Sequence, residues 1–170
     1  MMYGISGTPG TGKSSIAAAL EERGHRVVRA ADTVHDYLVG SDPERQTVII
    51  DEEAWAENFV PVDGFVEGHL VHLLQCDLVI ILRCRPDVLR ARLEERGYPP
   101  DKVSENAEAE AMDVILVETL EIHPPGHILE VDTTDAPVRS CVEQIELFIR
   151  GEISSSYGKN DWSEYLEPRA

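Results

Sequence analysis

Residues 7–14 read GTPGTGKS, which matches the phosphate-binding pattern G-x-x-x-x-G-K-[ST] at every fixed position. An apolar run at residues 2–6 precedes this stretch, and residues 13–23 carry apolar side chains at helical spacing. A strand that enters a glycine-rich loop and leaves it as a helix is the context in which this pattern binds phosphate. The stretch therefore predicts a P-loop.

The residue types of this loop indicate how it would hold a nucleotide. Glycines let the backbone wrap around a phosphate and turn its N–H groups inward, at the positive end of the following helix. Lys13 would reach the β- and γ-phosphates, and Ser14 would ligate Mg²⁺. Ser15 stands where a dinucleotide-binding fingerprint needs glycine, and no Asn-Lys-x-Asp guanine-binding motif occurs, so both of those classes are excluded.

Strands and helices alternate along the rest of the chain, which predicts an α/β fold with a parallel sheet. We expect further strands at residues 26–30, 64–67, 78–83 and 127–131. Helices are expected near residues 32–38, 52–57, 69–74, 86–96, 104–122 and 137–150, with a loop at residues 98–102 and a strand or irregular segment at residues 47–51. The helix at residues 104–122 should carry a solvated acidic face of Glu105, Glu108, Glu110, Asp113 and Glu118.

Composition limits the classes to which the chain can belong. Its 170 residues suit a single domain, and no run of ~18 apolar residues is present, so no transmembrane helix is expected. The N-terminus does not resemble a secretory signal, and the three cysteines form no CxxC pair, so we expect a cytoplasmic protein with reduced thiols. The net charge of −17 would repel DNA and RNA and attract basic proteins.

Four side chains outside the loop are candidates for the phosphate site. The strand at residues 78–83 ends in arginine, so the acid on the metal side must come from elsewhere, and Glu67 at the end of another strand is the best candidate. His69 could orient a water or a hydroxyl as a general base. Arg92 and Arg96 share one helix face and could close over transferring phosphates. The plain alternatives are a solvated acid, a packing histidine and solvated arginines.

These motifs together resemble one family. The loop GTPGTGKS, a strand that ends in acid-x-His, and RLEERGYPPDKVSEN at residues 92–106 are similar to the adenylate kinase isoenzyme six (CINAP) family of archaea and eukaryotes. RLEERGY followed by a lysine and Glu-Asn is the most specific part, because many families share P-loops. The resemblance covers about residues 1–150 and leaves out a polar tail at residues 151–170, which we expect to be ordered only if Trp162 or Tyr165 finds a pocket.

The resemblance implies a nucleoside monophosphate (NMP) kinase fold, a P-loop NTPase fold of three layers (α/β/α) with a five-stranded parallel sheet in the middle layer. Residues 1–150 would form one domain, with an NMP-binding segment at about residues 29–52 and a short lid at about residues 95–105. The residues it implies for the ATP phosphates are Gly10, Gly12, Lys13, Ser14 and Ser15. Arg96 would contact ATP from the lid, Ser14 and Glu67 would bind Mg²⁺, and Lys13, Glu67, His69 and Arg96 would form the catalytic set.

This chain departs from the family pattern at two positions. Glu67 stands where aspartate is common, which lengthens the carboxylate arm by one methylene. Some members place an arginine where His35 stands, to hold the acceptor phosphate, and Arg45 is the residue that could replace it.

The resemblance implies transfer of the γ-phosphoryl group of ATP to AMP or another monophosphate, together with ATPase activity. It also implies a role in maturation of the small ribosomal subunit and its RNA, with a basic small-subunit ribosomal protein as partner. Two alternatives remain open. One is an ATP-switched assembly factor with little kinase activity, and the other is a small-metabolite P-loop kinase of the shikimate or dephospho-CoA type.

Overall fold

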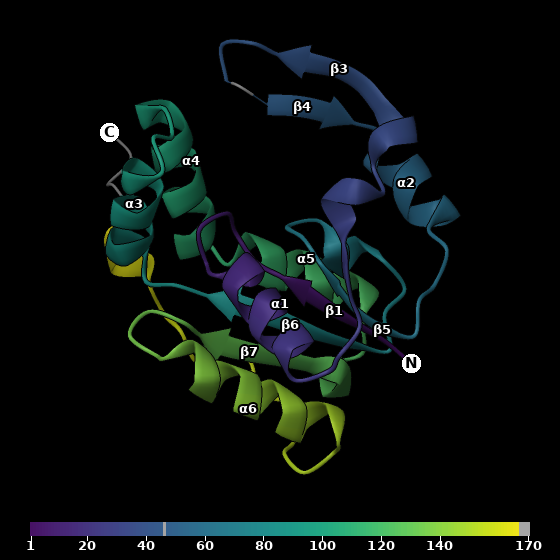
Figure 1. Cartoon of the computed structure of the whole chain (residues 1–170). Helices are drawn as coiled ribbons and strands as arrows, with labels where there is room; N and C mark the ends of the chain where they lie inside the picture. The colour runs from purple at the N-terminus through teal and green to yellow at the C-terminus, as the bar shows by residue number, and fades with distance from the viewer. Residues whose placement is uncertain (46, 167–170) are drawn as a thin grey trace.

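A computed structural model describes residues 1–45 and 47–166 of the chain. Five strands form one sheet in the order β2-β5-β1-β6-β7 (Figure 1), and they are β1 (Met2–Ser6), β2 (Val27–Arg29), β5 (Gly64–Glu67), β6 (Leu78–Arg83) and β7 (Ile128–Asp132). Every neighbouring pair in this sheet is parallel, so the carboxyl ends of all five strands meet at one edge. The predicted α/β fold with a five-stranded parallel sheet is confirmed.

Helices cover both faces of the sheet, and β6 shows how its sequence allows this. Ile80 and Leu82 belong to a buried cluster with α1 (Lys13–Glu22) and α6 (Val138–Ile149). The alternate residues Val79 and Ile81 belong to a second cluster with α5 (Val114–Ile122) and the 3-10 turn Val71–Leu73. A strand that is apolar on both sides is therefore buried on both faces. Within residues 1–45 and 47–166, no helix is long and apolar enough to cross a bilayer.

Two segments stand apart from the sheet (Figure 1). One is the antiparallel hairpin of β3 (Leu38–Asp42) and β4 (Thr47–Ile50), which α2 (Glu52–Asn58) follows. The other is the pair of helices α3 (Pro86–Glu95) and α4 (Pro100–Ala111), which has a small buried cluster of its own. They occupy the stretches for which an NMP-binding segment and a lid are predicted, and those two assignments stay predictions.

The helix predicted near residues 32–38 is wrong. Two 3-10 turns, Ala30–Asp32 and His35–Tyr37, lead directly into β3. Val34 and Tyr37 do pack against the core, so their spacing reflects the burial of these turns rather than a helix. The helix predicted at residues 69–74 is likewise reduced to one 3-10 turn.

The single helix predicted for residues 104–122 is two helices, α4 and α5. α4 already begins at Pro100, inside the predicted loop, because proline suits the first turn of a helix, where its missing N–H is not needed. The break falls at Asp113, whose φ of 57° is left-handed and whose carboxylate accepts a hydrogen bond from Arg83 at 2.5 Å. Glu110, predicted to be solvated, is buried.

The C-terminal stretch packs against the body as far as residue 166. Ser156 forms a parallel bridge with Leu129 on β7, and Trp162 is only 8% exposed. A short 3-10 turn, Ser163–Tyr165, contacts α4. The sequence predicts that this stretch is ordered only if Trp162 or Tyr165 finds a pocket, and the burial of Trp162 meets that condition. Residues 167–170 of the predicted tail lie outside the described residues.

Candidate functional site

The P-loop joins the carboxyl end of β1 to the start of α1. Gly10 and Gly12 have φ angles of 91° and 103°, which side chains of L-residues rarely adopt. A Cβ atom at Gly10 would also lie 2.8 Å from Cδ1 of Leu89, so glycine is what lets α3 approach the loop. The first N–H groups of α1 have no partner within the helix, and such a helix start binds anions readily.

Lys13 is folded back over this loop. Its Nζ donates hydrogen bonds to the carbonyl oxygens of Gly7 at 2.7 Å and Thr8 at 3.1 Å. Burial lowers the pKa of Lys13 to about 8, against the opposing attraction of Glu67 and Glu110. The ammonium is thus held beside the P-loop in a partly desolvated position, where an anionic ligand would interact with it strongly.

A cleft of about 1120 Å³ opens above the loop. Its walls are the P-loop, the end of β5, the β3–β4 hairpin and the α3–α4 pair. The cleft brings together most of the residues that the sequence assigns to catalysis, phosphate binding and metal binding, namely Gly10, Gly12, Lys13, Ser14, Glu67, His69 and Arg96. Ser15 lies instead in a smaller pocket that adjoins the cleft at Gly10, Gly12 and Arg96.

Glu67 and His69 lie at the carboxyl edge of the sheet, as the strand pattern predicts. Glu67 is buried, and its Oε1 is 3.6 Å from Nε of Arg29 on the neighbouring strand β2. Burial raises the pKa of Glu67, while Lys13 and Arg29 act in the opposite direction. Desolvation and then the charge of Lys13 lower the pKa of His69. His69 is exposed as a residue, and both effects act in the direction that keeps its imidazole neutral near pH 7.

The donor atoms of Ser14 and Glu67 fit a magnesium ion. Both side chains line the cleft, and a hydroxyl and a carboxylate supply the hard oxygen ligands that Mg²⁺ prefers. In the part of the chain that the structure describes, no cluster of three or more His, Cys, Asp and Glu could hold a metal by itself. A magnesium ion here would therefore share its ligands with nucleotide phosphates and water, which is its usual mode of binding.

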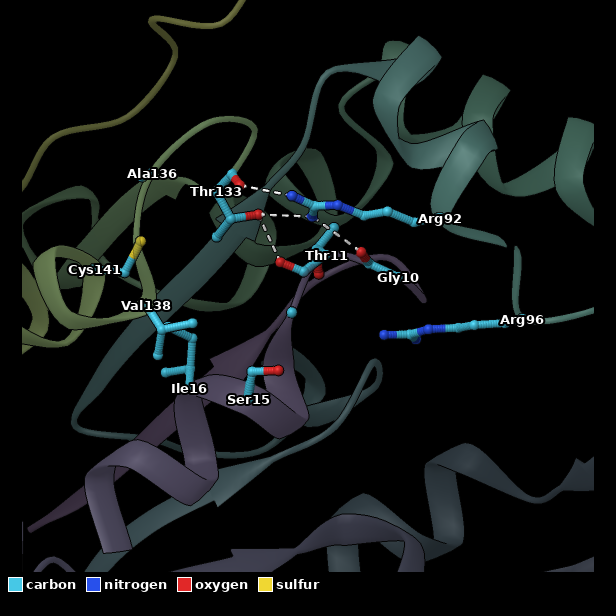
Figure 2. A pocket seen from close by; sticks show the side chains of 11 residues that line it. Gly10, Thr11, Ser15, Ile16, Arg92, Arg96, Thr133, Ala136, Val138 and Cys141 are labelled. Atoms are coloured by element: carbon cyan, nitrogen blue, oxygen red, sulfur yellow. Dashed lines mark hydrogen bonds between the residues drawn. The ribbon is translucent and has the colours of Figure 1, made fainter. Parts of the chain in front are cut away.

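The smaller pocket, of about 170 Å³, lies between the P-loop, α3 and the loop that follows β7 (Figure 2). The sequence motifs do not predict this smaller pocket. The signal in the sequence is the polar stretch TTDAP at residues 133–137, which follows a strand of a parallel sheet at the edge where such sheets bind ligands.

Arg92 on α3 and Arg96, which directly follows α3, take different positions at this pocket (Figure 2). The guanidinium of Arg92 donates to the carbonyl oxygens of Gly10 at 3.2 Å, Thr133 at 2.8 Å and Thr134 at 3.2 Å. Arg92 therefore ties α3 to the P-loop and to the loop after β7. Arg96 extends toward the P-loop without a hydrogen bond to the other residues drawn in Figure 2. The shared helix face predicts that both arginines close over phosphates, and the resemblance assigns ATP contact to Arg96 alone. In the structure, the two terminal nitrogens of Arg92 already donate to backbone carbonyls.

His72 is a buried residue behind the site that the sequence left without a role. Its Nδ1 lies 2.8 Å from Oγ of Ser6, the last residue of β1, and its Nε2 lies 2.6 Å from Oε2 of Glu118 on α5. The Ser6 hydroxyl is also 3.3 Å from the carbonyl oxygen of His69. Burial lowers the pKa of His72, and Glu118 partly offsets this effect. His72 thus connects the strand before the P-loop to the segment that carries His69.

Comparison with known proteins places this geometry in a family. A family model described as AAA domain matches residues 4–113. A protein of Archaeoglobus fulgidus named "Putative adenylate kinase" is 43% identical over an alignment of 173 positions, which covers 99% of this chain and 96% of that protein. A protein of the same name from Methanothermobacter thermautotrophicus is 42% identical over 170 residues, which span 97% of this chain and 99% of that protein.

The solved structures agree on the fold. Shikimate kinase from Acinetobacter baumannii, in complex with shikimate, superimposes with a TM-score of 0.59 over 89% of this chain and 93% of its own. Its sequence identity is 12%, so this likeness concerns the fold alone. The archaeal matches, in contrast, run through nearly the whole chain, so the expectation that the resemblance ends at about residue 150 is wrong. The chain belongs to the same family of P-loop proteins as the two archaeal proteins named "Putative adenylate kinase".

Proposed function

We propose that this chain is a nucleoside monophosphate kinase that transfers the γ-phosphoryl group of ATP to AMP or another monophosphate. The observation that carries the proposal is the single cleft of about 1120 Å³, which has the P-loop lysine on one side and a separate hairpin wall on the other. Pockets for a single drug-sized ligand usually measure about 300–1,000 Å³, so this cleft is larger than one such ligand needs. The names of the archaeal relatives support the same activity.

The reaction needs positioning and charge neutralisation rather than a covalent intermediate. The bond between the γ-phosphorus and the β–γ bridging oxygen of ATP breaks, and a phosphate oxygen of AMP forms the new bond, which gives two ADP molecules. Lys13 would neutralise the β- and γ-phosphates, and Arg96 would approach the transferred group from the end of α3. Mg²⁺, held by Ser14 and Glu67 together with the phosphates, would supply further neutralisation of charge.

His69 fits an orienting role better than that of a strong base. Its pKa is lowered, so the neutral ring offers a lone pair but has little tendency to keep a proton. Transfer to a monophosphate needs no base, because the attacking phosphate oxygen is already ionised. Where water takes the place of the acceptor, His69 would orient it, and ATP hydrolysis would follow as the minor activity.

Product analysis separates the possible reactions. Every reaction contains the chain, ATP and Mg²⁺. The acceptor is AMP, CMP, UMP or GMP in one set, shikimate or dephospho-CoA in a second set, and is left out in a third. Lys13→Ala is the control in each set. A kinase of this class forms ADP and the matching diphosphate only when a monophosphate is present. Phosphate release without an acceptor identifies an ATPase. Transfer to a metabolite and to no monophosphate contradicts the proposal.

A second function, implied by the family resemblance, is that of an assembly factor for a basic small-subunit ribosomal protein in rRNA maturation. The net charge of −17 suits a basic partner of this kind. Opposite charge speeds association, and the effect falls as salt rises. The experiment is a pull-down with such a protein at several salt concentrations, with and without ATP and Mg²⁺. Release on addition of ATP, and retention by Glu67→Gln, would support a switch. Equal partner affinity with and without nucleotide would leave the kinase alone.

A further inference from the structure

We propose that the C-terminal stretch of residues 156–162 positions the P-loop, with Trp162 acting through Arg83 and Glu110. Trp162 would then be a positioning residue of the nucleotide site, although it lies outside both pockets described above. The proposal rests on the kinase function proposed above, because the P-loop is where that function places the ATP phosphates.

The inner contact joins the P-loop to α4. The Thr8 hydroxyl donates a hydrogen bond of 2.6 Å to Oε2 of Glu110, and both residues are buried. The other carboxylate oxygen of Glu110 accepts from Nε of Arg83 at 2.7 Å and from the backbone N–H of Cys84 at 3.1 Å. The orientation of Glu110, and through it that of Thr8, therefore depends on where Arg83 lies.

Arg83 is the centre of the network. It ends β6, is 2% exposed, and donates to Asp113 and Glu130 as well as to Glu110. Burial acts to lower the pKa of its guanidinium, but attraction to Glu110 and then Glu130 outweighs this effect, so the net pKa is raised and the group stays charged. Buried charges hold a fixed geometry only while water is kept out, because water weakens each of these attractions.

The C-terminal stretch supplies that cover. The centroid of the Trp162 ring lies 4.9 Å from Cζ of Arg83, and the backbone N–H of Gly158 donates to Oε2 of Glu130 at 2.6 Å. Ser156 holds the start of the stretch against β7 through its bridge to Leu129. Figure 1 shows the yellow segment that ends at residue 166 beside the α3–α4 pair, where the turn Ser163–Tyr165 contacts α4. One continuous set of contacts thus runs from Trp162 through Arg83 and Glu110 to Thr8.

A positioning role and a merely stabilising role give different results in a double-mutant cycle. The two changes are Trp162→Ala, which uncovers Arg83, and Thr8→Val, which removes the hydrogen bond to Glu110. The readout is the Kd for ADP, and for a non-hydrolysable ATP analogue, measured by titration of the full chain below its melting temperature. We expect each single change to raise Kd about threefold to tenfold, which lies within the roughly twofold to thirtyfold effects typical of residues in a coupled network. The double variant should be no weaker than the weaker single variant.

Three further variants complete the experiment. Trp162→Phe keeps an aromatic face over Arg83 and should retain an affinity close to that of the wild type. Trp162→Leu keeps an apolar cover and replaces Trp162→Ala in the cycle if that variant does not fold. Ile153→Ala is the matched control, because Ile153 comes just before this stretch and packs against the core cluster of α6 rather than Arg83. It should lower the melting temperature and leave Kd unchanged.

The outcomes keep this proposal distinct from the proposed function. If the effects of Trp162→Ala and Thr8→Val multiply independently, or if a folded Trp162 variant binds nucleotide like the wild type, the positioning role is overturned and the kinase function stands. If the wild type binds no nucleotide, both proposals fail together. Kd values that rise in the single variants and rise no further in the double variant support the positioning role.

Discussion

Arg45, beside the turn of the β3–β4 hairpin, forms an ion pair with Glu105 on α4, with 3.2 Å between Nη2 and Oε1. The pair joins the two segments that stand apart from the sheet, and both residues line the cleft between them. The side chains are 63% and 54% exposed, and exposed pairs of this kind contribute only about 0.2–1 kcal/mol. A phosphate that enters the cleft can therefore compete with Glu105 for Arg45.

This competition gives opposite predictions for the two partners. Glu105→Gln removes this ion pair and leaves Arg45 with its longer contact to Asp42, at 3.7 Å. We therefore expect the KM for the acceptor monophosphate to fall by up to about fivefold, the factor that corresponds to ~1 kcal/mol. Arg45→Ala removes the cation and should raise the same KM. Initial rates with AMP varied at saturating ATP measure both effects, with Arg139→Ala, an exposed arginine on α6, as the control. A shift in the same direction for both variants would show that Arg45 acts only through its ion pair.

Arg92 and Arg96 should respond differently to alanine. Arg92→Ala removes hydrogen bonds from a charged donor to Gly10, Thr133 and Thr134, and each bond of this kind contributes about 1.5–3 kcal/mol. We expect a lower melting temperature together with weaker nucleotide binding. Arg96→Ala should leave the melting temperature unchanged and lower turnover more than nucleotide affinity, since it would act after closure. Equal losses of turnover and affinity for Arg96→Ala would place Arg96 in the ground-state ATP site instead.

Loss of the P-loop lysine should affect transfer and hydrolysis alike, because both need the charge of the β- and γ-phosphates neutralised. Lys13→Ala should lower each rate by on the order of 10²–10³, the usual effect of removing one charge-stabilising donor. Coupled assays with and without AMP measure the two rates. Turnover at the wild-type level in either assay would contradict the assignment of Lys13.

The parts of the site that the sequence predicted are those that depend on local pattern. GTPGTGKS specifies its own loop, and its flanking strand and helix follow from short-range periodicity. The placement of Glu67 and His69 follows from one topological rule, that parallel strands present their carboxyl ends at the same edge. Neither step needs knowledge of a partner far away in the chain.

The parts that were missed depend on such partners. Glu110 reads as one acid among several on a solvated helix face, and its burial is fixed by Arg83 and Thr8, which lie 27 and 102 positions away. The break at Asp113 that separates α4 from α5 is held by the same arginine. Arg92 finds its carbonyl acceptors 41, 42 and 82 positions away. Periodicity carries no information about contacts of this kind.

The first strand of the hairpin, β3, was missed for a different reason, whereas β4 agrees with the strand suggested at residues 47–51. Leu38 and Val39 follow a plausible helix start at Asp32, and only pairing with β4 fixes them as a strand. The tendency of a residue to form a strand depends strongly on the strands beside it, more than helix propensity depends on context. A hairpin of two strands that stands apart from the sheet is therefore hard to predict from its local sequence.

The lowered pKa of Lys13 predicts a proton uptake that calorimetry can measure. Burial brings this pKa to about 8, so at pH 8.5 roughly three quarters of the free protein carries a neutral lysine. Nucleotide phosphates favour the ammonium form and raise its pKa, so binding at pH 8.5 should take up a fraction of a proton, and affinity should fall as pH rises above 8.

Titrations with ADP in two buffers of different ionisation enthalpy, at pH 8.5, give the number of protons taken up. Lys13→Arg is the matched variant, because a guanidinium remains charged at this pH and has no proton to gain. The uptake seen in the wild type should therefore disappear in Lys13→Arg, while protonation of the nucleotide itself contributes equally to both proteins. Equal proton uptake in the two would mean that Lys13 is already fully charged before the phosphates arrive.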